Sequence, residues 1–284
     1  MSSFFHPYRG VDVSVTTKHE KTPLIQPAFA SLLEIKLYEV SLDTDQLGTF
    51  SGEIERSDLP KETAIKKALL GINESGARFG IASEGSISSD FLIPWVQADY
   101  EVMVFVDVET DLVISETFTS REIVTATAKV RIGDDLTSLI ERADLPRHGV
   151  IVRPLNGDNR YIVKGIHSIK ELHEAIKNCS PYSPLNQVEI QSDFRAMHSP
   201  SRQQNIQTLA EKLARRVNAQ CPDCRTPGWG VVDVEKGVPC GDCGGINNER
   251  VSREILGCNV CELKTLGKVV NFEIEAAQCQ FCNP

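Results

Sequence analysis

Eight cysteines in the last quarter of the chain constrain its fold more than any other feature. They form four Cys-x-x-Cys pairs at similar intervals: Cys221/Cys224, Cys240/Cys243, Cys258/Cys261 and Cys279/Cys282. A two-residue gap lets a tight turn direct both sulfurs at one ion, and Zn²⁺ takes four such thiolates in a tetrahedron. Because eight thiolates complete two tetrahedra, the pattern predicts two structural Zn²⁺ ions with no open catalytic position.

The spacing of the pairs is compatible with two ways of sharing the metals. Sequential pairing joins the first pair to the second and the third to the fourth, and gives two zinc ribbons. Interleaved pairing gives one cross-braced unit. We expect sequential pairing. Disulfides or an iron–sulfur cluster are other uses of such cysteines, but a reducing cytosol disfavours disulfides. The ninth cysteine, Cys179, is expected to be a buried apolar residue.

The charge and hydropathy of the chain exclude several other classes of protein. The formal net charge of −9 argues against a basic nucleic-acid-binding surface, since phosphate neutralisation needs clustered Lys and Arg. No apolar run reaches the length of about 18 residues that a membrane helix needs. The N-terminus lacks the apolar stretch of a secretory signal. We therefore expect a cytoplasmic protein with no membrane partner, and a homo-oligomer is compatible with the sequence.

Residues 1–219 alternate between strand and helix patterns, which predicts an α/β domain with a mixed sheet flanked by helices. Strands are expected at 11–17, 34–40, 79–83, 100–108, 112–118, 123–130, 149–153, 161–164 and 188–191. Helices are expected at 23–33, 61–73, 134–143, 168–178 and 200–217. At Gln220, Cys, Gly, Pro and Asp become frequent and helical periodicity stops. The predicted boundary therefore separates residues 1–219 from a double zinc-ribbon-like module at 220–284.

The first candidate site is Thr16-Thr-Lys-His-Glu-Lys21, at the junction of the first strand and the first helix. Backbone amides at a helix N-terminus, together with Lys18 and Lys21, make an anion site of the kind that nucleotide phosphates occupy. A solvated helix start with hydroxyl capping is the competing interpretation. Lys18 and Lys21 are therefore candidate phosphate ligands.

A second candidate site consists of acidic residues just beyond predicted strands. Asp43 and Asp45, then Glu53 and Glu55, then Glu84 lie among glycines, where an open α/β sheet places its ligands. Converging carboxylates can hold Mg²⁺, which prefers oxygen ligands and retains waters that become nucleophiles. Taken singly, each acid fits a surface turn. The candidate Mg²⁺ ligands are Asp43, Asp45, Glu53 and Glu84, with Glu53 and Glu84 as candidate catalytic residues.

The third candidate site is the segment 192–202, which follows a strand and opens the long last helix. Arg195 and Arg202 have the fork geometry that binds phosphate or carboxylate groups. An equally good interpretation is a buried ion pair between Asp193 and Arg195 that stabilises the junction of strand and helix. The histidines near these segments are expected to be structural: His148 and His198.

Several motifs together resemble an uncharacterised family catalogued as a domain of unknown function. They extend over nearly the whole chain: Thr-Lys-His-Glu-Lys (17–21), Asp-Thr-Asp-Gln-Leu-Gly-Thr-Phe-Ser-Gly-Glu (43–53), Ala-Ser-Glu-Gly-Ser (82–86), Asp-Phe-Arg-Ala (193–196) and Cys-Gln-Phe-Cys-Asn-Pro (279–284). The resemblance implies the architecture. It implies no catalytic residue.

Residues 11–118 are similar to the inosine-triphosphate pyrophosphatase-like and Maf-like nucleotide hydrolases. The first loop of those enzymes has the pattern Thr-x-Asn-x-x-Lys, similar to the motif at 16–21. Their second helix has Asn-Ala-x-x-Lys-Ala, similar to Thr-Ala-Ile-Lys-Lys-Ala at 63–68. Lys18 and Thr63 replace the two motif asparagines, so the hydrogen bonds of those asparagines are not transferred.

This second resemblance implies roles for three residues. Lys21 and Lys67 correspond to phosphate-contacting lysines of those enzymes. Glu84 corresponds to the acidic residue after the third strand, which binds Mg²⁺ or activates water. A related branch has Gly-x-Glu-Gly-Gly at this strand, similar to Ala-Ser-Glu84-Gly85-Ser here.

The leading hypothesis is a Mg²⁺-assisted α/β enzyme that binds and hydrolyses a nucleotide or similar phosphorylated small molecule. Lys18, Lys21 and Lys67, with Arg195 or Arg202, would neutralise the phosphate charge. The alternative is a non-catalytic zinc-ribbon adaptor for a protein or nucleic acid. In that case Trp229, beside the first cysteine pair, is a docking residue rather than a cover for the zinc core.

Overall fold

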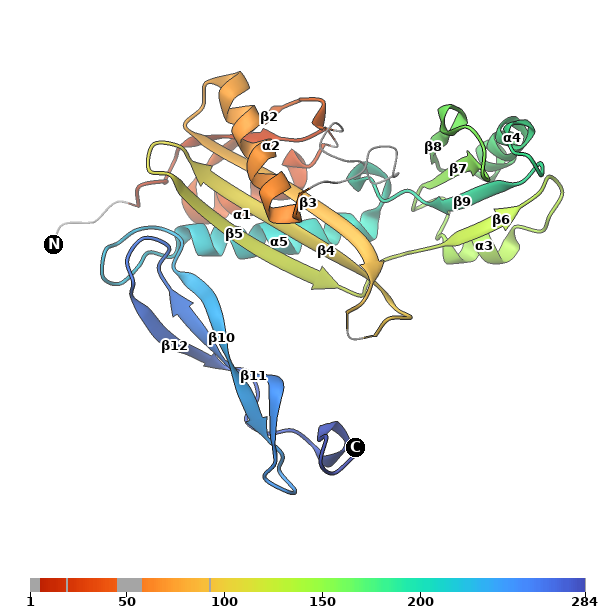
Figure 1. Ribbon diagram of the computed structural model, residues 1–284. Helices are drawn as coiled ribbons and strands as arrows, with labels where there is room; N and C mark the ends of the chain where they lie inside the picture. The colour runs from red at the N-terminus through yellow and green to blue at the C-terminus, as the bar shows by residue number, and fades with distance from the viewer. Residues whose placement is uncertain (1–5, 19, 45–57, 92, 284) are drawn as a thin grey trace. The chain divides into compact units, whose positions relative to one another are not determined.

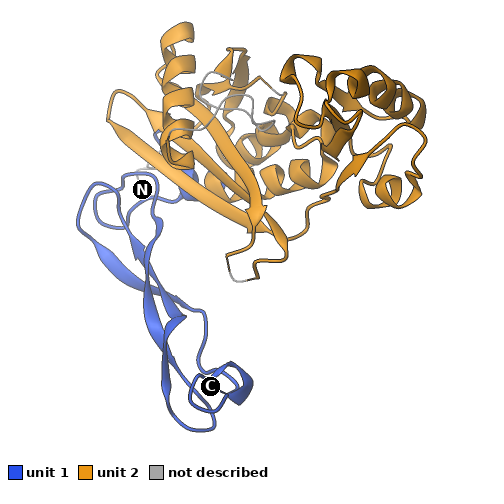
Figure 2. Ribbon diagram, turned by 45° about the vertical axis from the view of Figure 1, so that its right-hand side comes forward, with its two compact units in different colours: residues 1–8, 214–284 blue, residues 9–213 orange. Residues whose placement is uncertain are grey.

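The computed structural model describes residues 6–18, 20–44, 58–91 and 93–283. The chain forms two compact units, residues 9–213 and residues 1–8 with 214–284 (Figure 2). The boundary predicted at Gln220 falls within the second unit. Three acidic residues of the second candidate site, Asp45, Glu53 and Glu55, lie outside the described residues.

The larger unit is built around a five-stranded sheet with the order β2-β1-β3-β4-β5 (Figure 1). Strands β2, β1 and β3 are parallel, because a helix returns the chain between each of them. Strands β4 and β5 add an antiparallel meander. The strands are β1 (Asp12–Thr16), β2 (Lys36–Val40), β3 (Phe79–Ser89), β4 (Gln97–Asp107) and β5 (Leu112–Ser120).

Helices cover both faces of this sheet (Figure 1). Alternate side chains of a strand point to opposite faces. In β4 the even-numbered residues therefore lie on one face of the sheet and the odd-numbered residues on the other. On one face α2 (Pro60–Ser75) packs an apolar stripe against β3 and β4, through Ala64, Ala68, Ile72, Ala82, Val102, Val104 and Val106. On the other face α5 (Pro200–Asn218) contacts Asp99 and Glu101 of β4. The helix α1 (Thr22–Leu33) connects β1 to β2.

A close approach between α2 and β1 requires a glycine at position 71. A Cβ atom at Gly71 would lie 1.9 Å from Oγ1 of Thr16, the last residue of β1. That distance is far below van der Waals contact. The missing side chain therefore lets the helix lie directly over the end of the strand.

A second, four-stranded sheet in the same unit has the order β6-β9-β7-β8, and its neighbouring strands are antiparallel. Its strands are β6 (Thr127–Val130), β7 (Val150–Pro154), β8 (Val163–Ile166) and β9 (Val188–Ser192), with helices α3 (Thr137–Arg142) and α4 (Ile169–Cys179). The start of α4 is determined locally by a capping box between Ser168 and Glu171. Cys179 is buried, and its thiol lies 3.0 Å from the carbonyl oxygen of Tyr161.

The second unit contains a long antiparallel ribbon. It comprises β10 (Gly230–Pro239), β11 (Ile246–Gly257) and β12 (Lys264–Val269), in that order. A small apolar cluster lies among the cysteines: Val238, Cys240, Ile274 and Cys279. Apolar burial of this extent is small for an independent unit, and such units commonly need a metal or disulfides for stability.

The strands and helices predicted for residues 1–219 are present, and most of their ends differ by a few residues from the prediction. Strand β3 is the main difference. It continues past the predicted end at Ser83 to Ser89, because its pairing with β4 extends to Gln97. No helix among the described residues has the length and apolarity needed to cross a membrane.

Replacement of Gly71 by alanine should lower the free energy of unfolding by about 1–3 kcal/mol, as overpacking does elsewhere. Helix propensity alone predicts the opposite, a gain of about 1 kcal/mol. In a Thr16→Ala background the loss should shrink, because the clashing hydroxyl is gone. Urea unfolding of the single and double variants tests this, with the exposed α2 substitution Glu74→Ala as the control. A stabilised Gly71→Ala protein would contradict the close approach.

Candidate functional site

The order of the strands creates a switch point at the end of β1. The chain leaves β1 toward β2 on one side, then returns to β3 on the other. Such points are where open α/β sheets bind ligands, at the carboxyl ends of the strands. β1 ends at Thr16, and its residues Ser14 and Val15 pair with Gly80 and Ile81 of β3. Ser83 and Glu84 therefore lie on β3 just past the end of β1.

Lys21 is the central cation at this switch point. It directly precedes α1, its side chain is buried, and its Nζ atom donates a hydrogen bond to Oγ of Ser83 at 2.9 Å. Burial, and then the positive charge of Arg202, lower the pKa of Lys21 to about 8. Within the part of the chain that the structure describes, no carboxylate forms an ion pair with this lysine.

A buried ion pair lies on the α2 side of the sheet. Nζ of Lys67, on α2, lies 2.5 Å from Oε2 of Glu84, on β3, and both side chains are almost fully buried. Thr16 faces the same helix through Gly71, and its hydroxyl is buried without a hydrogen-bond partner among the described residues. The charges of Lys67 and Glu84 both act on Lys21, so the pair belongs to the same charged cluster.

A second buried pair lies on the α5 side. Nε of Arg202 donates to Oε1 of Glu101 at 2.5 Å, and neither side chain is exposed. Arg202 also donates to the carbonyl oxygen of Phe194 at 2.7 Å. Glu101 pairs with Gly85 across the β3–β4 ladder, and a Cβ atom at Gly85 would lie 2.5 Å from its carboxylate. The glycine of the Ser-Glu-Gly-Ser motif therefore makes room for the Glu101 carboxylate.

Asp99 continues this polar row along β4. It is fully buried and accepts a hydrogen bond from Nδ2 of Asn205 at 2.8 Å. Burial, and then the negative charge of Glu101, raise the pKa of Asp99 to about 7. Oδ1 of Asp99 and Oε2 of Glu101 are both buried without a hydrogen-bond donor in the described structure. Two carboxylates so placed cannot both ionise easily, and a proton on Asp99 relieves their repulsion.

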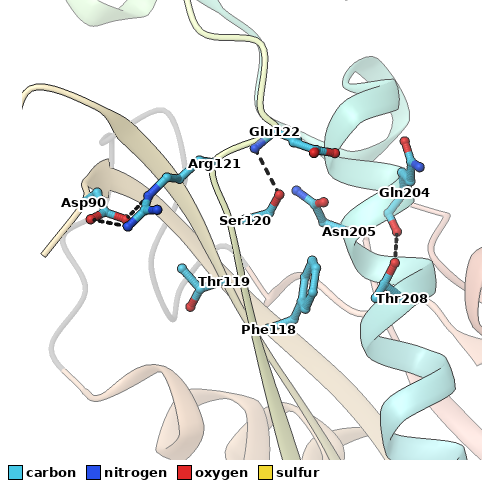
Figure 3. Close-up of a pocket in the computed structure, with 9 residues that line it drawn as sticks. All are labelled: Asp90, Phe118, Thr119, Ser120, Arg121, Glu122, Gln204, Asn205 and Thr208. Carbon is cyan, nitrogen blue, oxygen red and sulfur yellow. Dashed lines mark hydrogen bonds and ion pairs between the residues drawn. The ribbon is translucent and has the colours of Figure 1, made fainter. Parts of the chain in front are cut away.

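A cavity of about 510 Å³ lies between the end of β5 and α5, and Asn205 is one of its walls (Figure 3). Its lining is mostly polar: Asp90, Phe118, Thr119, Ser120, Arg121, Glu122, Gln204, Asn205 and Thr208. Arg121 and Asp90 form a two-bonded ion pair across one side. Of the site residues predicted from the sequence, none that the structure describes lines this cavity.

The remaining predicted site residues that the structure describes lie in separate ion pairs. Nζ of Lys18 contacts Asp43 at 2.8 Å in an exposed pair. Arg195 contacts Asp193 at 2.6 Å. This is the ion pair at the junction of strand and helix that was the alternative to phosphate binding by Arg195. The expected convergence of carboxylates is not seen among the described residues, because Asp43 and Glu84 each contact a lysine instead.

Three members of the charged cluster were not identified from the sequence: Ser83, Asp99 and Glu101. A signal for two of them was present, since Asp99 and Glu101 occupy alternate positions just before the apolar run Val102–Val106. Alternation of this kind places both acids on one face of the strand. Their partners on α5 lie about a hundred residues later, so the sequence pattern of the strand does not identify them.

In the second unit, the eight paired cysteines gather into two groups of four. The groups are Cys221, Cys224, Cys258 and Cys261, and Cys240, Cys243, Cys279 and Cys282. Sulfur–sulfur contacts of 3.6 Å in the first group and 3.7 and 3.9 Å in the second agree with the edge of about 3.8 Å expected for a tetrahedron with Zn–S bonds of about 2.3 Å. Backbone N–H groups donate to several of the sulfurs, as thiolate ligands require. The donor set fits two Zn²⁺ ions.

The expected sequential pairing is wrong, because the first pair joins the third and the second joins the fourth. The β10–β11 hairpin is the reason. Ten residues of extended strand span about 33 Å and separate the first pair from the second. Antiparallel return of β11 brings the third pair back beside the first, since Gly230 pairs with Gly257.

Residues 67–284, more than half of the chain, match the family described as a domain of unknown function, DUF6671. The chain belongs to the DUF6671 family. The matched region starts at Lys67 and includes Glu84, Glu101, Arg202 and all eight paired cysteines, whereas β1 and Lys21 precede it. No curated protein matches the chain.

Metal content of double cysteine variants tests the interleaved pairing in this DUF6671 protein. Wild type purified under reducing conditions should carry two Zn²⁺ per chain. Cys221→Ser/Cys258→Ser removes two ligands of one group, so one Zn²⁺ should remain. Cys221→Ser/Cys240→Ser damages both groups, so neither Zn²⁺ should survive dialysis against a weak chelator. Sequential pairing predicts the reverse order of metal contents for these two variants.

Removal of the buried acid at position 99 should change how stability depends on pH. Between pH 3.8 and about 7, folded Asp99 keeps a proton that the unfolded chain has lost. This group therefore makes stability fall as pH rises, by about 1.4 kcal/mol per pH unit within that window. Asp99→Asn should remove that part of the slope, as measured by urea unfolding at several pH values. The exposed Asp111→Asn variant should leave the slope as it is, and equal slopes in all three proteins would refute a protonated Asp99.

Proposed function

We propose that the larger unit binds a nucleotide or similar phosphorylated small molecule at the switch point and hydrolyses it with the assistance of Mg²⁺. The observation that carries the proposal is Lys21, a buried cation at the ligand-binding end of the sheet. No ion pair to Lys21 is formed among the described residues, and a buried ammonium group in such a position is costly to maintain. A bound phosphate would supply the missing counter-charge and would raise the lysine's lowered pKa again.

The charge balance of the cluster supports an anionic ligand. Three cations (Lys21, Lys67 and Arg202) surround two paired carboxylates (Glu84 and Glu101). With its pKa raised to about 7, Asp99 is partly protonated at neutral pH and cancels only part of this excess. Net positive charge is therefore available for a phosphate.

The likeness of residues 11–118 to pyrophosphatase-like nucleotide hydrolases supports the same ligand class. The three residues to which that likeness gives a role, Lys21, Lys67 and Glu84, belong to one charged cluster. In the proposed reaction the Lys67 side chain exchanges its ion pair with Glu84 for one with the phosphate. Glu84 would then be available to hold a Mg²⁺ ion, which would neutralise phosphate charge and carry a bound water.

A second candidate function is favoured by exposed apolar side chains on the cysteine-rich unit. Phe272 is 80% exposed, and Val260, Phe281 and Leu266 are close to 60%. Contiguous exposed apolar patches mark protein interfaces, and these side chains are the candidates for such a patch. Trp229 is half-buried. A protein adaptor, rather than a nucleic-acid adaptor, agrees with the acidic chain.

A hydrolysis screen over nucleoside triphosphates with Mg²⁺ tests the enzyme proposal. Wild type should release phosphate or pyrophosphate from at least one substrate. Lys21→Met and Glu84→Gln should each lower kcat/KM by about 10²-fold or more. Each variant lacks a side-chain charge that would bind the reacting phosphate or the metal.

Lys66→Met is the matched control, because Lys66 neighbours Lys67 on α2 but forms an exposed pair with Asp58. It should retain activity. Complete inactivity of the wild type on all triphosphates, or equal losses in Lys66→Met and Lys21→Met, would reject the proposal. Thermal melting of each variant separates lost chemistry from lost folding.

A further inference from the structure

Two imidazole rings lie together in the larger unit, His167 just before α4 and His198 just before α5. Their ring centroids are 5.1 Å apart, and Nε2 of His167 lies 2.9 Å from Nδ1 of His198. Two glycines make room for them. A Cβ atom at Gly149 would lie 3.0 Å from Nε2 of His167, and one at Gly165 would lie 3.1 Å from Nε2 of His198.

The hydrogen bonds determine which nitrogen carries the proton when both rings are neutral. Nδ1 of His167 lies 3.0 Å from the carbonyl oxygen of Pro146. A carbonyl oxygen only accepts, so Nδ1 of His167 must carry hydrogen and its Nε2 must be a lone pair. Nδ1 of His198 must then donate to that lone pair. The remaining nitrogen of His198, Nε2, is therefore an unprotonated base.

His148 shows what a structural histidine looks like in the same region. Its Nδ1 atom donates to Asp144 at 2.8 Å, and its Nε2 lone pair accepts the backbone N–H of Ser201 at 3.1 Å. The lone pair thus satisfies a free amide at the start of α5. By contrast, Nε2 of His198 has no hydrogen-bond partner within the described parts of the chain.

Burial favours the neutral form of His198 at pH 7. Burial is the main cause that lowers its pKa. Arg195 and His167 lower the pKa further, while Asp193 and Glu20 oppose them. The net direction is downward, so the base form is available at neutral pH.

The segment that carries His198 is linked to the charged cluster of the switch point. Glu20, the residue before Lys21, acts electrostatically on His198. The segment that carries His198 is also attached to the cluster, since Arg202 binds both Glu101 and the carbonyl oxygen of Phe194. Arg202 and Glu20 therefore link the segment of His198 to the cluster that contains Lys21.

We propose that Nε2 of His198 accepts the proton of the attacking water in the hydrolysis at the switch point, an inference that rests on the proposed function. As the water oxygen bonds to phosphorus, one water proton passes to Nε2. The bridging P–O bond breaks, and its electron pair leaves with the departing oxygen. Glu84 and the lysines orient and neutralise the phosphate, and His198 removes the proton.

The tautomer is tested without any activity measurement. Long-range ¹H–¹⁵N NMR of the full-length protein should show His198 neutral at pH 7 with hydrogen on Nδ1 and none on Nε2. His167→Ala removes the acceptor for that hydrogen, so His198 should then exchange between tautomers. Hydrogen on Nε2 of wild-type His198 at pH 7 would overturn the inference.

The role is tested by pH profiles of hydrolysis. His198→Asn keeps an N–H donor toward His167 but removes the base, so kcat/KM should fall by about 10²–10⁴-fold and lose its acid limb. His148→Gln keeps an acceptor for Ser201 and should retain the limb. An active wild type whose acid limb persists in His198→Asn contradicts this inference alone. A wild type with no hydrolase activity instead contradicts the proposed function.

Discussion

The buried ion pair between Arg202 and Glu101 is the interaction on which the larger unit depends. Neither side chain is exposed, and the pair attaches α5 to the centre of β4. Breaking a buried pair by removing one partner typically costs about 3–5 kcal/mol, because the other charge is left uncompensated. Gly85 is part of the same constraint, since any side chain there would displace the Glu101 carboxylate.

This ion pair also contributes, after burial, to the electrostatics of the candidate site. The charge of Arg202 helps to lower the pKa of Lys21, and the charge of Glu101 helps to raise the pKa of Asp99. The bond from Arg202 to the carbonyl oxygen of Phe194 positions the segment that carries His198. A structural contact and a candidate reaction centre therefore share the same residues, and changes to Arg202 would affect both.

Much of the larger unit could be predicted because its signals are local. The capping box of Ser168 and Glu171 and the small, apolar face of α2 lie within single elements. Lys21 and Lys67 were identified through short motifs, which are also local. Asp99 and Glu101 were missed because their partners on α5 are about a hundred residues away. Long-range pairing of this kind depends on how elements pack, which no short window of residues records.

The cysteine-rich unit separates the two kinds of information most clearly. The sequence by itself determined that two Zn²⁺ sites of four thiolates each can form, because ligand chemistry belongs to the side chains and their two-residue spacing. Only the tertiary structure decided which cysteines share a site. An antiparallel hairpin brings the ends of β10 and β11 together, so pairs distant in the chain become neighbours while consecutive pairs are held a strand length apart.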